Sequence, residues 1–261
     1  MTGEIYDEFA VARWPGDKWI KHHLWEPDAT VECPGGPSGT LTIQASPFTI
    51  SCPPHHVKVL MLSTTSFAPP DRGWIRFEVE MATVISETER NPFGADPGDP
   101  RLAAAAFNVI DPSTAMVFDF FVSNTRIAAV YERLPYAQTT ENPYPAFTVL
   151  TATDVPTSRG QWHKYAVAYD RAHNDVEWWV DDRKVVERRY VGAPSHRSGP
   201  IVKPETLRMG GGLFTLVDDL NNDLQRAGDN PKTRGLDSTS AHELFGQGGQ
   251  VQFRRFGVSL Y

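Results

Sequence analysis

The stretch WHKYAVAYDRAHNDVEWWVDDRKVV, residues 162–186, alternates large apolar and polar side chains on either side of a short polar turn. Tyr165, Val167 and Tyr169 share one side of the first segment, and Trp178 lies between two valines on one side of the second. Successive side chains of a strand point to opposite faces of a sheet, so this pattern predicts a β-hairpin. We expect its aromatic face to fill the space between two sheets, where large rings remove much apolar area from water.

Similar short apolar segments recur along the rest of the chain. Stretches rich in Gly, Pro, Asn and Asp separate them, and these residues favour turns. The expected strands cover residues 40–50, 56–63, 73–86, 103–110, 116–123, 126–134, 162–169, 175–181, 183–189, 206–214 and 250–260. One short helix is expected at residues 216–226, followed by a long loop. Many short strands at this spacing predict one all-β domain, a sandwich or a barrel, over residues 1–261.

The hairpin and the end of the chain together resemble a known superfamily. The order W-H-x-Y-A-V-x-Y, turn, W-W-V-D and the closing FRRFGVSLY are similar to the concanavalin A-like lectin/glucanase superfamily. The matching residues are Trp162, His163, Tyr165, Val167, Tyr169, Trp178, Val180 and Asp181, while Asp182 stands where that pattern has Gly. The resemblance implies an antiparallel two-sheet jelly-roll β-sandwich with one concave face. One fold hosts many activities, so it says little about function.

Three further patches resemble a set of actinobacterial and fungal proteins with this predicted fold. They are YERLPY at residues 131–136, GGGLFTLVDDL at residues 210–220 and ELFGQGGQVQFRRF at residues 243–256. This second resemblance supplies no chemistry.

Composition narrows the classes of partner. The chain has 261 residues and a formal net charge of −7 with no basic run, which disfavours nucleic acid and anionic membranes as partners. The first residues lack the charged-then-apolar layout of a signal peptide, so a cytoplasmic location is expected. Cys33 and Cys52 are then expected to be reduced, with a bridge between them as the alternative. No C-x-x-C or H-E-x-x-H pattern occurs, so neither a metal site nor a cofactor is predicted.

Catalytic carboxylates are the first candidates for chemistry. The glucanases that this fold resembles carry E-x-D-x-E on one strand, because alternate residues face one cleft. This chain lacks that motif. Its nearest counterpart is Glu78 and Glu80 with Arg76 two residues earlier, and the alternative for these residues is a solvated face.

A second candidate is Asp119, in the apolar stretch MVFDFFVS. If residues 116–134 form a hairpin, side chains of the two strands meet across it. Tyr131 and Arg133 would then complete a catalytic group, with Arg133 pairing the carboxylate and the Tyr131 hydroxyl serving proton transfer. Asn108, on the preceding strand, would add a polar contact. The alternative is a buried structural Asp–Arg pair.

The expected substrate contacts are spread over several strands. They are Asn108, Phe121, Glu78, Glu80, Trp179 and Phe214. His163 belongs to the fold motif and is expected in the core rather than as a general base. Oxygen-rich VDDLNNDLQ carries Asp218, Asp219 and Asp223, and whether these bind calcium stays open beside a capped helix or a lid.

Three function classes therefore remain open. The first is a cofactor-free enzyme of specialised metabolism, a cyclase, isomerase, lyase or hydrolase that binds a small molecule on the concave face. The second is a carbohydrate-active protein, either a divergent hydrolase or lyase or a sugar-binding module. The third is a non-catalytic interaction domain. The missing glycosidase motif and the apolar surroundings of Asp119 favour the first, and exposed tryptophans on an open groove would favour the second.

Overall fold

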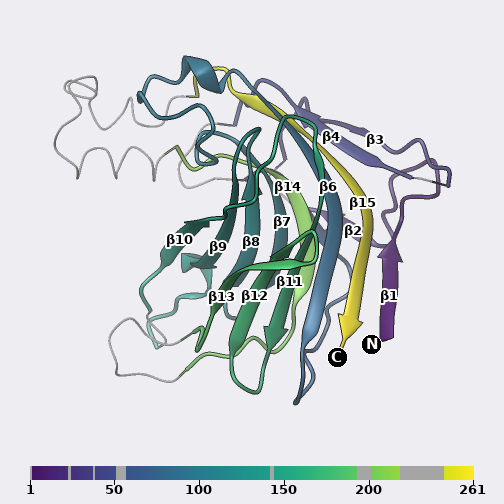
Figure 1. Cartoon of the computed structure of the whole chain (residues 1–261), viewed down its shortest axis with the longest axis vertical. Helices are drawn as coiled ribbons and strands as arrows, with labels where there is room; N and C mark the ends of the chain where they lie inside the picture. The colour runs from purple at the N-terminus through teal and green to yellow at the C-terminus, as the bar shows by residue number, and fades with distance from the viewer. Residues whose placement is uncertain are drawn as a thin grey trace.

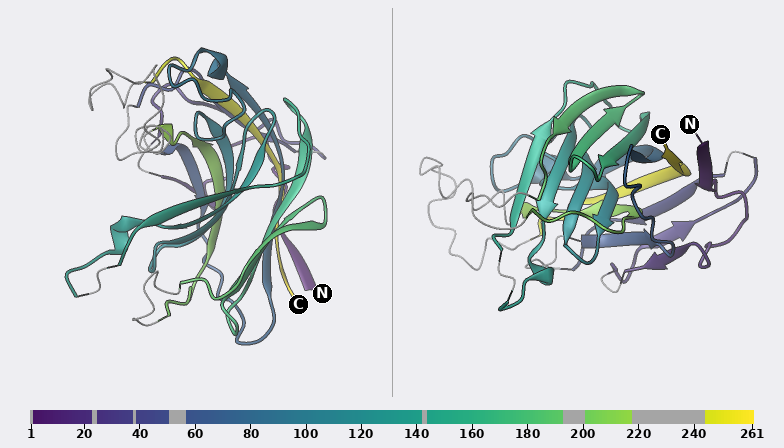
Figure 2. Two further views of the ribbon diagram at one scale, coloured as in Figure 1. Left: turned by 60° about the vertical axis from the view of Figure 1, so that its left-hand side comes forward. Right: turned by 90° about the horizontal axis from the view of Figure 1, so that it is seen from below.

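In a computed structural model, the protein forms two antiparallel β-sheets packed face to face (Figures 1 and 2). The structure describes residues 2–22, 25–37, 39–50, 57–141, 144–192, 201–217 and 244–261. In Figure 1 the long strands β6 and β15 bow around the strands of the second sheet. The expected jelly-roll sandwich is confirmed.

The first sheet, sheet A, contains the hairpin expected at residues 162–186. Its strands run in the order β13 (Arg183–Arg188), β12 (Asp175–Val180), β11 (Trp162–Asp170), β6 (Ile75–Ser86), β15 (Gly248–Leu260), β4 (Leu41–Ala45) and β3 (Thr30–Glu32), and β1 (Thr2–Asp7) also pairs with β15. Because β1 and the end of β15 are partners, the N- and C-termini lie side by side in every view (Figures 1 and 2).

The second sheet, sheet B, runs in the order β10 (Phe147–Ala152), β9 (Ile127–Arg133), β8 (Met116–Val122), β7 (Ala104–Asp111), β14 (Arg208–Phe214), β5 (Val57–Ser63) and β2 (Trp19–Lys21). Two short 3-10 turns, η1 (Thr88–Arg90) and η2 (Pro135–Ala137), lie in connections. Late strands are inserted between early ones, since β14 separates β7 from β5 and β15 separates β6 from β4. Neighbours within each sheet therefore come from distant parts of the chain.

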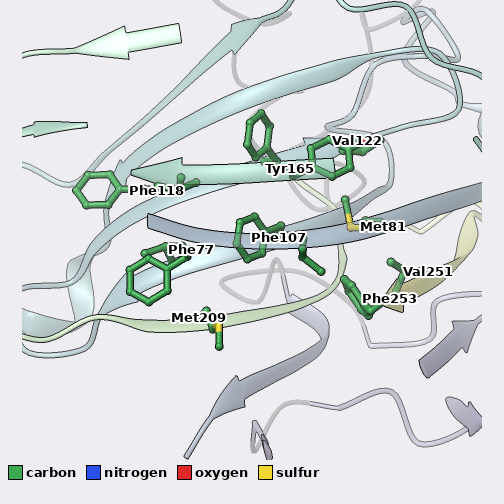
Figure 3. Close-up of a cluster of buried hydrophobic side chains, with 14 of the residues drawn as sticks. Phe77, Met81, Phe107, Phe118, Val122, Tyr165, Met209, Val251 and Phe253 are labelled. Atoms are coloured by element: carbon green, nitrogen blue, oxygen red, sulfur yellow. The ribbon is translucent and has the colours of Figure 1, made fainter. Parts of the chain in front are cut away.

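One large apolar core fills the space between the sheets. Figure 3 shows side chains from both layers meeting there, with Phe77 and Tyr165 from sheet A and Phe107 and Phe118 from sheet B. Trp178 joins the layers directly, because its indole N–H donates to the backbone carbonyl of Asp119 at 2.9 Å. The structural role expected for the hairpin aromatics is confirmed.

The turn between β12 and β13 explains how Asp182 replaces the usual Gly. Asp181 and Asp182 have φ angles of 49° and 62°. Two positive φ values are what a type I′ hairpin turn needs, and Asp tolerates this region better than most residues. The Asp181 carboxylate also accepts from the Lys164 backbone N–H at 2.9 Å and contacts His163 Nδ1 at 2.7 Å. His163 is only 5% exposed, which confirms its place in the core, and no described residue forms a hydrogen bond with its Nε2.

Four strands at the sheet margins were not expected from the sequence. They are β1, β2, β3 and β10. β2 and β3 have three residues each, too short to display an alternating pattern, and in β10 the burial does not alternate. The expected helix at residues 216–226 lies almost wholly outside the described residues. Within the described part of the chain, no helix is long and apolar enough to cross a membrane.

Candidate functional site

Asp119 lies on the face of sheet B that points away from sheet A and from the main core. This face is here called the free face because sheet A does not pack on it. Its neighbours Phe118 and Phe120 pack into the main core, and the period of two turns Asp119 to the other side of β8. Phe121, which shares this side, packs in a second apolar cluster instead. The strand is buried on both faces, so a carboxyl group sits among apolar side chains.

The Asp119 carboxyl group is almost fully buried, with 2% of the residue exposed. It accepts hydrogen bonds from the Asn108 side-chain amide at 2.5 Å and from the Val109 backbone N–H at 3.2 Å. Burial raises its pKa well above the ordinary value, the nearby Glu132 carboxylate raises it further, and the two hydrogen bonds oppose the shift. The environment therefore favours the protonated acid, which can donate a proton.

The expected grouping of Asp119 with Tyr131 and Arg133 is wrong. In the β8–β9 register, Phe118 lies opposite Tyr131 and Met116 lies opposite Arg133. Paired residues share a face, so Tyr131 and Arg133 point to the core side while Asp119 points away from it. Asp119 lies opposite Val130, and among the described residues no cation forms an ion pair with it.

Glu132 is a second carboxylate near Asp119, and it was not among the residues expected from the sequence. It lies opposite Val117 and so shares the free face with Asp119, one step diagonally across the two strands. The residue is 6% exposed, and its Oε1 accepts a hydrogen bond from Thr148 Oγ1 at 2.9 Å. The alternation of Val130 and Glu132 against Tyr131 and Arg133 was visible in the sequence. Only the hairpin register, however, relates that alternation to Asp119.

Asn108 supplies an open hydrogen-bonding group beside Asp119. The residue is 4% exposed, and its Oδ1 has no hydrogen-bond partner among the described residues. The polar contact that we expected between Asn108 and Asp119 is present, because the two lie opposite each other in the β7–β8 pair. A buried amide oxygen without a partner costs free energy, and a ligand donor placed there would remove that cost.

Next to Asn108, the free face has a strip without side chains. Gly210 of β14 lies opposite Asn108, and Gly212 lies opposite Ala106. A Cβ atom at Gly210 would come within 2.1 Å of the Met61 carbonyl oxygen, so β14 and β5 have no room for one. Glycine is required here because the two backbones approach closely.

An apolar wall borders the same face. Phe121 and Phe214 contact each other with ring centroids 5.3 Å apart. Leu60 and Val130 belong to the same cluster. Both expected aromatic contacts therefore lie on the face that carries Asp119, and their role toward a ligand stays a prediction.

The remaining expected contacts are on the opposite side of the molecule. Glu78, Glu80 and Trp179 lie on the outer face of sheet A, and the core separates them from Asp119. Glu78 is 3.3 Å from Lys164 Nζ, and the Arg76 guanidinium stacks over Trp179 at 5.1 Å. These side chains form a paired, partly solvated surface. Grouping them with Asp119 was wrong, because a strand pattern does not say which sheet a strand joins.

Metal and thiol chemistry finds little support in the described ranges. No group of three or more His, Cys, Asp or Glu there could hold a metal ion. Cys33 is a free thiol whose Sγ lies 3.3 Å from the Val11 carbonyl oxygen, and burial raises the pKa of that thiol. Cys52 and the acidic positions Asp218, Asp219 and Asp223 lie outside the described residues.

Comparison with protein families gives a match over most of the chain. A model described as "Family of unknown function (DUF6081)" matches residues 25–260. The chain belongs to this family. The chain is also similar to "Uncharacterized protein L829" of Acanthamoeba polyphaga mimivirus, which is 29% identical over 258 residues. The match covers 71% of this chain and 60% of that protein, so the chain spans well under the full length of this relative.

Several solved structures with the same architecture carry the names of enzymes that act on glycans. The β-agarase A of Zobellia galactanivorans has a TM-score of 0.55 at 12% identity, covering 100% of this chain and 94% of that one. Crh5 transglycosylase in complex with NAG gives 0.54 at 15%, covering 99% and 84%. An endo-1,3-β-glucanase of Streptomyces sioyaensis gives 0.52 at 13%, covering 99% and 95%. At such low identity these likenesses establish the fold alone, and that fold is the jelly-roll sandwich expected from the hairpin.

Proposed function

We propose that this protein is a carbohydrate-active enzyme that cleaves or transfers a glycosidic bond on the free face of sheet B. Asp119 is the proton donor and Glu132 is the second carboxylate. Asn108 orients Asp119 and offers its free Oδ1 to a sugar hydroxyl. The glycan-directed names of proteins with this fold support the substrate class.

The observation that carries this proposal is a buried Asp119, whose pKa burial raises, beside a second carboxylate on one face. A general acid must hold its proton at the working pH, and burial tunes carboxyl groups toward that state. Glycosidases use two carboxyl groups, one as acid and the other as base or nucleophile. Here the pair is spread over two neighbouring strands, which accounts for the missing E-x-D-x-E motif.

The distance between the two carboxyl groups decides the stereochemical outcome. Carboxyl pairs of inverting glycosidases are about 6.5–9.5 Å apart, whereas retaining pairs are about 5–5.5 Å apart. If the reaction is hydrolysis, NMR of the first product will read whether the anomeric carbon is inverted or retained.

The proposal is tested by measuring reducing-end release from a panel of neutral and acidic polysaccharides. Asp119→Asn and Glu132→Gln should each lower kcat on the active substrate by about 10²-fold or more while the proteins stay folded. Glu80→Gln, on the outer face of sheet A, is the matched control and should retain full activity. An Asp119→Asn protein as active as the wild type would refute the assignment.

A second candidate is a cofactor-free acid–base enzyme for a small, largely apolar molecule. The observation in its favour is the apolar wall formed by Phe121, Phe214 and Leu60 beside Asp119. Calorimetric titration separates the two. Saturable binding of oligosaccharides that Asp119→Asn weakens supports the first candidate, and binding of aromatic small molecules with no response to sugars supports the second.

A further inference from the structure

Arg133 is a buried cation for which the described residues supply no carboxylate partner. It is the last residue of β9 and is 8% exposed, and its Nε has no hydrogen-bond partner in the described part of the chain. Arg126 and Arg183, by contrast, pair with Asp96 and Asp154 at 2.6 Å each, and their side chains are 46% and 55% exposed. Among the described arginines, Arg133 is the one that is buried.

A tyrosine holds the guanidinium in place. The Arg133 group lies 3.6 Å from the ring centroid of Tyr144, in a cation–π contact. Tyr144 is itself fixed, because its hydroxyl donates to the Leu134 carbonyl at 2.5 Å. Burial lowers the pKa of Arg133, and the two nearby tyrosines partly oppose this shift. The ring orients the cation, and the described residues supply no anionic acceptor for its N–H donors.

The acid in the same cross-strand row is already engaged. Asp111, Met116 and Arg133 are register partners across β7, β8 and β9. One Asp111 oxygen accepts from the Ser113 backbone N–H and hydroxyl at 2.8 and 2.6 Å, and the other accepts from the Glu205 N–H at 3.0 Å. These contacts hold Asp111 in a turn rather than against the guanidinium.

Tyr131 adds a second donor on the same face of β9. It precedes Arg133 by two residues, so both side chains point to the core side of sheet B at its end. The Tyr131 oxygen accepts from the Gly192 backbone N–H at 2.8 Å, and no acceptor for its own hydrogen occurs in the described part of the chain. Burial raises the pKa of Tyr131, so its hydroxyl keeps the hydrogen. Arg133 and Tyr131 thus place two hydrogen-bond donors at the same end of sheet B, and the described residues leave both without an acceptor.

We propose that Arg133 and Tyr131 bind an oxyanion, a carboxylate or phosphate group of a ligand, at this end of the sandwich. A buried charge is costly without a partner, and a guanidinium matches the geometry of such groups with two parallel hydrogen bonds. The site is distinct from the Asp119 face, because the side chains point from opposite sides of sheet B. It does not rest on the proposed glycosidic activity.

The test is calorimetric titration of the full chain with sodium phosphate and with sodium acetate, at constant ionic strength set by sodium chloride. The wild type should bind one of the two anions saturably. Arg133→Met should abolish this binding, and Arg133→Lys and Tyr131→Phe should each weaken it by about tenfold or more. Arg126→Gln, which removes an exposed and paired arginine, should bind as the wild type does. A preference for phosphate identifies a phosphorylated ligand, and a preference for acetate identifies a carboxylate ligand.

Two outcomes would overturn the proposal. One is no saturable binding of either anion to the wild type. The other is binding that Arg133→Lys and Tyr131→Phe leave unchanged. If Arg133→Met does not fold, the wild-type titration and these two conservative variants still decide.

Discussion

At the scale of single residues, one step along β8 or β9 decides the chemistry of a side chain. Asp119 and Glu132 meet on the free face of sheet B, while Phe118 and Arg133 point to the core side. A one-residue change of register would exchange these sets completely. The carboxyl pair thus depends on the turn at residues 123–125, which joins β8 to β9 and fixes their register, as much as on the acids themselves.

Asp119→Asn should make the folded protein more stable at neutral pH. The pKa of Asp119 is raised in the folded state from an ordinary value of 3.8. Between these two pKa values the unfolded chain has lost the proton that the folded chain keeps, so the wild type loses stability as pH rises through this window. An asparagine side chain keeps the shape and does not titrate. The melting temperature of the Asp119→Asn protein minus that of the wild type should therefore grow as pH rises from about 4 to about 7.

Thermal unfolding at several pH values measures this difference directly. Asp96→Asn, at an exposed residue paired with Arg126, serves as the control and should show no such growth. A difference that shrinks with rising pH would mean that the folded protein holds Asp119 as a carboxylate, and the proton-donor role would fall with it.

At the scale of elements, the position of β14 depends on three residues without side chains. Its three consecutive glycines sit between β7 and β5, and a side chain at two of them would meet the backbone of β5. Gly211 faces the core instead, where a Cβ would come within 2.5 Å of the Phe253 ring. The glycines of β14 therefore allow β14 and β5 to approach closely. They also leave the free face beside Asn108 without side chains.

Gly212→Ala should destabilise the protein by about 2–3 kcal/mol, a typical cost of overpacking. The new Cβ would lie 1.8 Å from the Val59 carbonyl oxygen, so β14 and β5 would have to separate. Gly3→Ala on β1 is the control, because its nearest neighbour would be 3.6 Å away, and a change within about 0.5 kcal/mol is expected. Urea unfolding measures both. Equal effects at the two sites would contradict the close approach of β14 to β5.

At the scale of the whole molecule, the N-terminal segment completes the fold although the family match starts at residue 25. It supplies β1 to sheet A and β2 to sheet B. Phe9 and Trp19 are each 1% exposed, and the Trp19 ring packs 4.6 Å from Phe256 of β15. Segments from both ends of the chain thus close one end of the same core.

A chain that begins at Trp25 should therefore be much less stable than the full chain. Removing one large aromatic side chain from a core typically lowers the free energy of unfolding by about 3–5 kcal/mol. The truncation removes two of them, Phe9 and Trp19. Thermal unfolding and solubility measure the loss. Val11→Ala, at a position 60% exposed, is the control within the same segment and should melt with the wild type. A truncated chain that melts like the full one would show that the family core folds without these strands.

Sequence periodicity predicted much of the fold. The alternation in residues 162–186 identified the hairpin and the inward positions of Tyr165, Tyr169 and Trp178, because burial imposes a period of two on any half-buried strand. The margins were harder, since three-residue strands such as β2 carry too few residues to show a period. For the site, the sequence singled out Asp119 by its apolar surroundings and Asn108 as a polar contact from the preceding strand. It grouped Arg133 with Asp119 although the two lie on opposite faces, and it omitted Glu132.

What the sequence by itself determined is therefore local: strand positions, the alternation of faces and the unusual polarity of Asp119 within an apolar strand. Only the tertiary structure decided which faces meet. The insertion of β14 beside β7 put Gly210 next to Asn108, and the separate sheets placed Trp179 on the far side from Asp119. The physical reason is that strand pairing joins residues distant in the chain, through contacts that no local pattern encodes.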